Sequence, residues 1–263
     1  MPLRLTTAYH SVTGLREQNE DFVGMVAPRD PERSSKGMIA AIADGVSGSD
    51  GGREAAEYCV RGLLTDYYAA ADTWPVTQSL DKMIKAINCW LHQQGGMATT
   101  LTVLVMRGEV YYFAHVGDTR LYLLRDGELT KLTNDHVDDR PEFRHVLTRA
   151  IGLGSELTID HGMGELRVGD IFLLASDGVW GAMPNDDLSW HLSELIDDKR
   201  SADGTAKLLT DAALAGGSTD NASVLIVRID QLTMAQTNPL TWGQLILAVS
   251  LLVSLLLSLL VLK

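Results

Sequence analysis

The sequence has few cysteines, and neither supports disulfide or cysteine chemistry. Cys59 and Cys89 are the only two among 263 residues. Both fall in stretches with helical periodicity, so no disulfide framework is expected and a reducing compartment fits better. Neither is followed six residues later by an arginine. The Cys-x5-Arg pattern of the cysteine phosphatases is therefore absent, which excludes that class of enzyme.

Basic charge is also scarce. The 22 lysines and arginines are outnumbered by 34 aspartates and glutamates, which gives a net charge of -12. No basic run could neutralise a phosphate backbone, so we expect no nucleic-acid partner. HExxH, Walker A and Rossmann glycine patterns are missing, and Ser47 in "GVSGS" lacks the last glycine of G-x-S-x-G. The sequence thus offers no activated nucleophile.

A long hydrophobic run occurs only near the C-terminal end. Residues 245–262 hold no charge, and as a helix they reach about 27 Å, close to the thickness of a bilayer core. Trp242 stands where an interfacial aromatic residue is expected. We predict a transmembrane helix over 242–262, preceded by a linker over 231–241. The alternative is a buried core helix, although such a helix normally keeps a polar stripe.

The first residues of the chain hold no apolar stretch long enough for a secretory signal. We therefore expect a single-pass protein of the inner (cytoplasmic) membrane, with the domain over residues 1–230 on the cytoplasmic side. The basic residues nearest to the span, Arg228 and Lys263, lie on opposite sides of it and do not decide its orientation. The predicted topology depends on the missing signal alone.

Hydrophobic periodicity predicts helices and antiparallel strands within residues 1–230. Helices are expected over 53–71, 78–94, about 185–196 and 201–215. Residues 98–132 are rich in β-branched and aromatic residues separated by turn signals, which predicts consecutive hairpins. Two further strands are expected, one ending at Asp177-Gly178 and one starting at Asp220-Asn221. This order favours an α+β domain, in which helices cover packed sheets, over a βαβ dinucleotide fold.

Three aspartates next to apolar strands indicate the chemistry. Asp44 and Asp177, each followed by glycine, come after at least five apolar or small residues, and Asp220 precedes an apolar run. A carboxylate near a core is costly unless something neutralises it. Mg²⁺ and Mn²⁺ prefer oxygen ligands and often form two-metal sites. A hard divalent cation is therefore the simplest explanation. Asp126-Gly127, with polar neighbours, is predicted to be only a turn.

Six short motifs follow one another along the chain: "GLREQNEDF", "AIADGVSG", "HVGDTRLY", "LTRAIG", "LLASDGVWG" and "STDNASVLIV". Through them residues 6–229 resemble the PPM family of metal-dependent serine/threonine protein phosphatases (type 2C), and its bacterial members in particular. The resemblance implies two packed antiparallel β-sheets flanked by helices on both faces, an α-β-β-α sandwich. That fold agrees with the α+β prediction from periodicity.

The resemblance also implies a cofactor of two or three Mn²⁺ or Mg²⁺ ions. Asp44 would bridge two of them, and Asp118 would help Asp177 to hold a third. The residues assigned to metal ions in this way are Glu20, Asp44, Gly45 through its carbonyl, Asp118, Asp177 and Asp220.

The catalytic residues that the resemblance implies are Arg16, Asp21 and Asp44. Arg16 would hold the phosphate, because a planar guanidinium suits a phosphate dianion, and Asp21 would orient water at the metals. The implied reaction is hydrolysis of phosphoserine and phosphothreonine by direct attack of a metal-bridging hydroxide, without a covalent phosphoenzyme. His115 and His136 could donate a proton to the leaving group, but a structural role is favoured and neither is assigned.

Several alternatives stay open from the sequence. The chain could be a membrane-tethered pseudophosphatase that only binds phosphoproteins, or a metal-dependent hydrolase of small phosphoesters. The expected partners are phosphoprotein substrates and the lipid membrane, and a serine/threonine kinase on the same membrane is a further hypothesis. Residues 134–152 are polar and are expected to form a mobile loop that faces the substrate.

Overall fold

The computed structural model describes residues 3–28, 35–46, 51–143, 146–196 and 199–232. Residues 1–233 form one compact unit. The predicted transmembrane helix over 242–262, and the predicted linker from residue 233 onward, lie outside the described residues. Within the described ranges, no helix combines the length and the apolar character needed to cross a bilayer.

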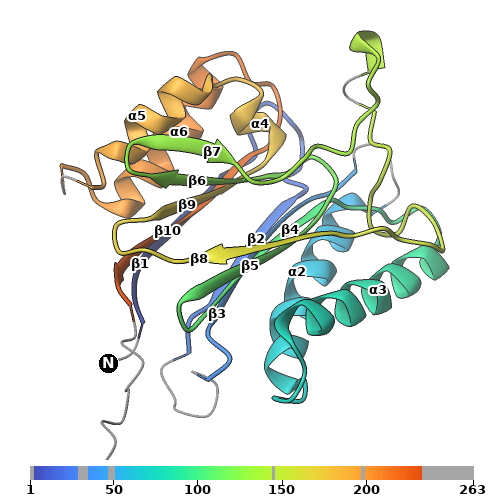
Figure 1. The fold of residues 1–263 in the computed structure, drawn as a ribbon. Coiled ribbons are helices and arrows are strands. Elements are labelled where there is room, and N and C mark those ends of the chain that lie inside the picture. Colours follow the sequence, from blue (N-terminus) through green and yellow to red (C-terminus); the bar gives the residue numbers. More distant parts are fainter. Residues whose placement is uncertain (1–2, 29–34, 47–50, 144–145, 197–198, 233–263) are drawn as a thin grey trace, which may run out of the picture. The chain divides into compact units, whose positions relative to one another are not determined.

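Two antiparallel sheets form the centre of this unit (Figure 1). Each has five strands within the described residues. The first runs in the order β1 (Arg4–Val12), β10 (Ala222–Gln231), β9 (Ile171–Ala175), β6 (Arg120–Arg125) and β7 (Glu128–Lys131). The second runs in the order β2 (Asp21–Val26), β3 (Met38–Asp44), β4 (Leu101–Arg107), β5 (Val110–Val116) and β8 (Asp160–Glu165).

Helices cover the outer face of each sheet (Figure 1). The second sheet carries α2 (Gly52–Ala69) and α3 (Val76–Gln94). The first carries α4 (Asp177–Trp180), α5 (Asn185–Ser193) and α6 (Ala202–Ala215). A short 3-10 turn, η1 (Pro141–Phe143), lies in the segment between β7 and β8. The predicted α+β architecture of packed sheets with helices on both faces is confirmed.

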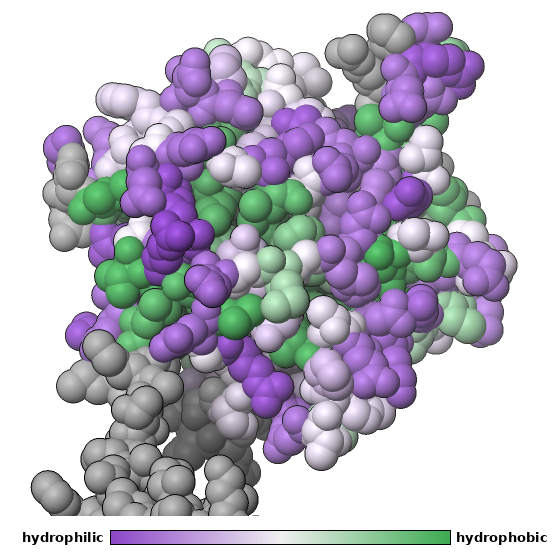
Figure 2. All heavy atoms as spheres, viewed as in Figure 1, coloured by the Kyte–Doolittle hydropathy of each residue, from purple (hydrophilic) through white to green (hydrophobic). Residues whose placement is uncertain are grey.

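Strands that are buried on both faces explain the continuous apolar runs in the sequence. Ala40 and Ile42 of β3 belong to the core between the two sheets, whereas Ile39 and Ala41 pack against α2 and α3. Successive side chains of a strand point to opposite faces, so a strand sandwiched between two layers needs apolar residues at every position. In Figure 2, hydrophilic residues cover most of the visible face and hydrophobic residues surface only in small areas.

The predicted elements are present, with small shifts at their ends. The expected series of hairpins over 98–132 is wrong at one turn, because β4 pairs with β5 and β6 with β7, whereas β5 and β6 belong to different sheets. The strand expected to end at Asp177-Gly178 stops at Ala175, because Asp177 instead begins the short helix α4, which periodicity did not predict. The strand expected from Asp220 begins at Ala222. Each shift moves an acidic residue out of a strand and into the adjoining loop or helix end.

Strand pairing brings distant acidic residues to one edge of the sandwich. In the first sheet β9 pairs with β6 and with β10, with Ala175 opposite both Arg120 and Val224. The chain segments that hold Asp118, Asp177 and Asp220 therefore meet beyond the same strand ends.

Candidate metal centre

Two aspartates lie opposite each other where strands β2 and β3 of the second sheet begin and end. Asp21 begins β2 and Asp44 ends β3, and the two are direct partners in the antiparallel pairing. Like charges placed directly opposite one another destabilise a sheet. Ser176 directly follows β9 of the first sheet, and its hydroxyl donates to Oδ2 of Asp21 at 2.8 Å. This bond joins the edges of the two sheets at the acidic residues.

Thr99 and Thr100, the two residues before β4, hold the backbone around Asp44. The Asp44 N–H donates to the hydroxyl of Thr100 at 2.9 Å, and its carbonyl accepts from the Thr100 N–H at 2.8 Å and the Thr99 hydroxyl at 2.9 Å. A Cβ at Gly45 would come within 2.3 Å of the backbone carbon of Gly52. Only glycine therefore allows the chain to pass this close to the start of α2.

The pKa of Asp44 lies well above its usual range. Burial is the main cause, and the negative charges of Asp21, Asp177, Asp118 and Asp220 add to it in that order. Burial disfavours a charged carboxylate, and neighbouring carboxylates disfavour it further. The charges of the other four aspartates proposed for the site therefore all act on the Asp44 carboxylate.

The pKa values of the neighbouring acids shift in the same direction. That of Asp21 is raised to about 7, chiefly by burial, with Asp177 and Asp220 adding to the shift. That of Asp118 is also raised to about 7, by burial and then by Asp177 and Asp135. The pKa of Asp177 is raised by burial and by Asp220, against a hydrogen bond with Asp44. The protein places negative groups together without neutralising them.

Asp220 has a cationic partner. Nη2 of Arg16 lies 2.5 Å from Oδ2 of Asp220, and the pKa of Arg16 is raised by this hydrogen bond and charge, with smaller contributions from Asp177 and Glu20. The Arg16 side chain is still 44% exposed. An arginine that faces both the acids and the solvent can take an anionic ligand at the mouth of the site.

Glu20 and Gly45 are joined through their backbones. The Gly45 N–H donates to the carbonyl of Glu20 at 3.1 Å, and the Glu20 N–H donates to Oδ1 of Asn221 at 2.8 Å. Oε1 of Glu20 lies 3.2 Å from the position that a Cβ on Gly52 would occupy. The side chain of Glu20 therefore extends toward the start of α2, beside the strand end that holds Asp44.

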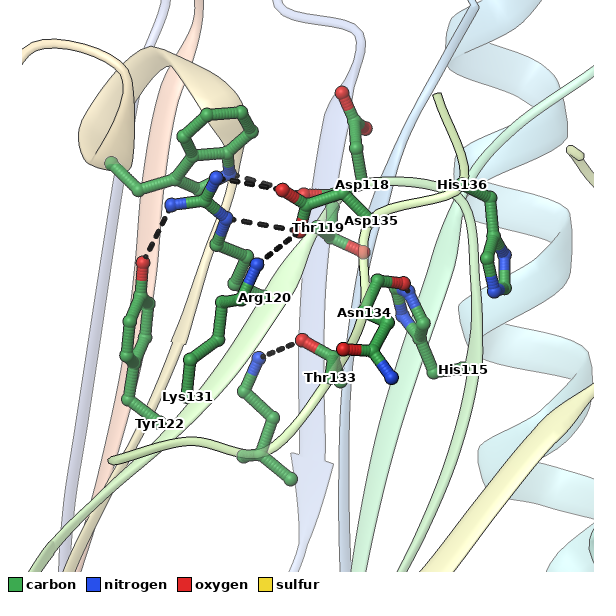
Figure 3. A network of polar contacts seen from close by, with 12 residues as sticks. His115, Asp118, Thr119, Arg120, Tyr122, Lys131, Thr133, Asn134, Asp135 and His136 are labelled. Carbon is green, nitrogen blue, oxygen red and sulfur yellow. Dashed lines mark hydrogen bonds and ion pairs between the residues drawn. The ribbon is translucent and has the colours of Figure 1, made fainter. Parts of the chain in front are cut away.

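Both candidate proton donors, whose positions are labelled in Figure 3, have structural contacts. His115 shares a hydrogen bond with Thr102 through Nδ1 and with the Asn134 carbonyl through Nε2, and burial together with His136 lowers the pKa of His115 to about 4. Nδ1 of His136 accepts from the Gly117 N–H at 3.0 Å. Both rings are buried, which supports a structural role for each.

The segment 134–152 is attached at its base. The Thr99 and Ile151 backbones bond to each other in both directions, at 3.0 and 2.8 Å. The Thr148 N–H donates to the His136 carbonyl at 2.8 Å. These bonds hold the two ends of the segment near Asp118 and Asp44. The predicted mobility of the segment stays a prediction.

The residues present suit a divalent cation. Oδ1 of Asp21 and Oδ1 of Asp177 are buried without a hydrogen-bond partner, and buried polar atoms are normally satisfied. In the rotamers described, no three His, Cys, Asp or Glu side chains already form a ligand cluster; Asp220 is turned to Arg16 instead. A hollow of about 270 Å³ borders Asp177 and Asp220 and is otherwise lined by glycines and small residues.

Comparison with known proteins identifies the family. Residues 17–211 match the model of the family described as protein phosphatase 2C. The chain belongs to this family. It is 31% identical to the serine/threonine protein phosphatase PstP of Mycobacterium tuberculosis, over 92% of this chain and 48% of that protein. The chain therefore spans about half the length of this relative.

Another member of the family, and the isolated catalytic domain of PstP, match over nearly their whole length. The serine/threonine phosphatase stp of Listeria monocytogenes is 28% identical, over 82% of this chain and 92% of the relative. The crystal structure of the PstP catalytic domain in complex with two manganese ions is 30% identical, with a TM-score of 0.71 over 86% of this chain and 99% of that one. The fold of the phosphatase 2C domain is thus shared.

Three residues at the centre were not predicted from the sequence. Ser176 bonds to Asp21. The amide of Asn221 donates to the carbonyls of Thr13 and Gln18, at 2.7 and 3.0 Å, and so holds the loop that contains Arg16. Trp180 donates to the carbonyl of Asp118. Ser176 and Asn221 adjoin predicted acids in the sequence, which was the available signal, whereas nothing in the sequence indicates the Trp180 contact.

Proposed function

We propose that this chain is a metal-dependent serine/threonine protein phosphatase. The observation that supports it best is the meeting of Asp21, Asp44, Asp118 and Asp177 at one edge of the sandwich with raised pKa values. Such a concentration of negative groups is expected where cations bind. The curated relatives, named as serine/threonine phosphatases, supply the reaction class.

We assign the metal ions to the acidic edge. The proposed ligands are Glu20, Asp44, the Gly45 carbonyl, Asp118, Asp177 and Asp220, for two or three Mn²⁺ or Mg²⁺ ions. Bound divalent ions supply positive charge against the phosphate and lower the pKa of water toward neutrality.

The protein's own groups perform the remaining tasks. Asp21, with one carboxylate oxygen held by Ser176 and the other buried without a partner, accepts a hydrogen bond from water and orients it. Arg16 is partly exposed beside Asp220 and binds the phosphate oxygens of the substrate. The buried setting strengthens each of these interactions relative to bulk water.

The test is hydrolysis by the purified full-length chain. With Mn²⁺, phosphoserine and phosphothreonine peptides should release phosphate at a higher kcat/KM than p-nitrophenyl phosphate or nucleotides, and EDTA should abolish turnover. Manganese binding without turnover would instead support a pseudophosphatase. A preference for nucleotides over phosphopeptides would support a small-molecule phosphoesterase. Turnover that survives EDTA would overturn the proposal.

We also propose that residues 242–262 anchor the protein in the inner (cytoplasmic) membrane, with the domain over 1–230 on the cytoplasmic side and 231–241 as linker. The support is the uncharged apolar run over 245–262. The full chain should sediment with membranes and resist extraction by carbonate, whereas a chain ending at residue 232 should stay in the supernatant. Recovery of the full chain in the supernatant would contradict the anchor.

The proposed substrates are phosphoproteins, and a serine/threonine kinase on the same membrane is the proposed source of them. The support is the family of serine/threonine phosphatases together with the apolar run. Deletion of the phosphatase should raise the phosphorylation of membrane-associated proteins. If no such phosphoprotein rises, the kinase partnership is refuted.

A further inference from the structure

We propose that Arg120, Asp135 and Trp180 form a clamp that positions Asp118 for metal binding and connects it to the root of segment 134–152. This role rests on the proposed function, because it acts through an aspartate assigned to the metal centre. We call these three residues the Trp180 clamp. Figure 3 labels Arg120 and Asp135 and marks the bonds between them with dashed lines.

Trp180 connects two acids of the centre. It is the last residue of α4, whose first residue is Asp177. Its indole N–H donates to the backbone carbonyl of Asp118 at 3.1 Å. One helical turn therefore contains one proposed ligand and the donor that fixes the backbone of another. The bond therefore links the backbone positions of Asp118 and Asp177.

Arg120 holds the indole ring in place. Its guanidinium carbon lies 3.4 Å from the centre of the Trp180 ring, a cation-π contact. Nε and Nη2 of Arg120 bond to the two carboxylate oxygens of Asp135 at 3.0 and 2.7 Å, and Nη1 donates to the Tyr122 hydroxyl at 3.0 Å. Because each guanidinium nitrogen has a partner, the plane on which the indole rests is fixed.

Asp135 extends the clamp to segment 134–152. The next residue, His136, bonds to both backbone groups of Gly117: its N–H donates to the Gly117 carbonyl at 2.7 Å, and its Nδ1 accepts from the Gly117 N–H at 3.0 Å. The turn that holds Asp118 is thus fixed on one side by His136 and on the other by Trp180. A displacement of residues 135 and 136 would move the turn, and with it the Asp118 carboxylate.

The turn needs such support because its own backbone is unusual. Gly117 has a φ of 106°, and a Cβ there would lie 2.6 Å from the Cβ of Thr100. No regular strand bond holds the Asp118 carbonyl, which instead accepts from the indole. Residues that orient metal ligands from outside the coordination shell typically change metal affinity by about 10- to 100-fold when they are replaced.

Trp180→Phe tests the clamp, since phenylalanine keeps an aromatic ring for Arg120 but has a smaller side chain without the N–H donor. Isothermal titration of the full chain with Mn²⁺ should show the affinity of the most weakly bound ion reduced about 10-fold, with little change in the melting temperature. Trp190→Phe is the matched control, because Trp190 is a 59% exposed tryptophan on α5, and its titration should equal that of the unchanged protein.

A double-mutant cycle separates positioning from a merely structural role. If Trp180 acts through Asp118, Trp180→Phe should cause no further loss of Mn²⁺ affinity in an Asp118→Asn background. Asp135→Asn, which removes the charge that orients Arg120, should show the same dependence and serves if the tryptophan variant does not fold. Equal losses in both backgrounds, or unchanged affinity in Trp180→Phe and Asp135→Asn, would overturn the clamp.

The same titrations distinguish failure of the clamp from failure of the metal centre. Asp44→Asn and Asp118→Asn should each reduce Mn²⁺ binding by themselves. If both bind Mn²⁺ as the unchanged protein does, the metal centre is wrong and the clamp falls with it. If both lose binding while Trp180→Phe does not, only the clamp is wrong.

Discussion

Strand β9 has an aspartate near each end, and the two are treated in opposite ways. Asp170 directly precedes the strand, and its side chain is only 1% exposed. Its carboxylate accepts from Nε and Nη2 of Arg125 at 2.8 and 2.6 Å and from the Arg167 N–H at 2.7 Å. At the other end, Oδ1 of Asp177 is buried without any partner.

The difference separates an acid with a fixed cationic partner from one that we assign to the metal centre. A buried carboxylate is tolerated when a fixed cation and hydrogen bonds replace its water, as Arg125 does for Asp170. Asp177 instead has Asp44 and Asp220 as neighbours, and burial and the Asp220 charge raise its pKa. Among the described residues Asp177 has no paired cation, and only the charge of Arg16, which is paired with Asp220, acts on it from a distance. The remaining neutralising charge must come from protons or from a bound cation.

The largest expected effect comes from a change at the acidic end, by which we mean the C-terminal end of β9, where Asp177 meets Asp44 and Asp220. Asp44→Asn should remove Mn²⁺ binding and lower kcat/KM on the order of 10³-fold, because a ligand lost from a metal centre costs several kcal/mol of transition-state stabilisation. Initial rates with a phosphopeptide and calorimetric titration with Mn²⁺ are the measurements. Without metal, the variant should unfold no more readily than the unchanged protein, since it removes a group whose ionisation burial and the neighbouring aspartates disfavour. Full Mn²⁺ affinity in this variant would refute the assignment.

The next effect comes from a change at the paired end, the N-terminal end of β9, where Arg125 neutralises Asp170. Asp170→Asn leaves Arg125 without its carboxylate partner and should lower the free energy of unfolding by about 3 kcal/mol. Mn²⁺ binding by the folded protein should not change. Urea unfolding and the same titration measure the two quantities. If Asp170→Asn instead weakened Mn²⁺ binding while leaving stability intact, the two ends would not differ in the way we describe.

The pH dependence of the metal-free protein sharpens the contrast. The pKa values of Asp21 and Asp118 are raised to about 7 in the folded state, from usual values near 3.8. The folded protein therefore keeps protons that the unfolded chain loses, and its stability should fall as the pH rises from about 4 through about 7.

Thermal melts in EDTA at pH 5 and pH 7.5 measure this dependence. The melting temperature should be lower at pH 7.5, and Mn²⁺ should raise it more at pH 7.5 than at pH 5, because the ions bind deprotonated carboxylates. Asp44→Asn should reduce the difference between the two metal-free melts. Greater stability of the metal-free protein at pH 7.5 would contradict the raised pKa values.

Much of the unpaired end could be predicted because its signal is local. Asp44 and Asp177 each follow an apolar run. Within each sheet, acids at the ends of adjacent strands meet when the strands pair, as Asp21 and Asp44 do in the second sheet. The layers could be predicted for the same reason, since strands apolar at every position must be covered on both faces. Helix positions followed from periodicity to within a few residues.

The remainder depends on contacts between residues far apart in the chain. Arg125 and Asp170 are separated by 45 residues, and Trp180 lies 62 residues from the carbonyl that it binds. The local pattern marks Asp177, which follows the apolar run, but it does not show that Asp170, which precedes the run, is paired with Arg125. Helix α4 was missed because a helix of four residues is too short to show periodicity.

The smallest expected effect concerns Arg16, the cation that the acidic end does have. It is paired with Asp220 at 2.5 Å, yet its side chain is 44% exposed, so it can turn to a phosphate when Asp220 engages a metal ion. Arg16→Ala should therefore raise KM about 10-fold, about 1.4 kcal/mol, and change kcat little, because it removes a binding contact. Arg200→Ala, which removes a partly exposed arginine paired with Glu194 at 3.1 Å, is the control and should leave KM unchanged.

Steady-state kinetics with a phosphopeptide decide between two roles. An unchanged KM with altered Mn²⁺ affinity would mean that Arg16 serves only to neutralise Asp220, and the acidic end would then resemble the paired end more closely than we propose.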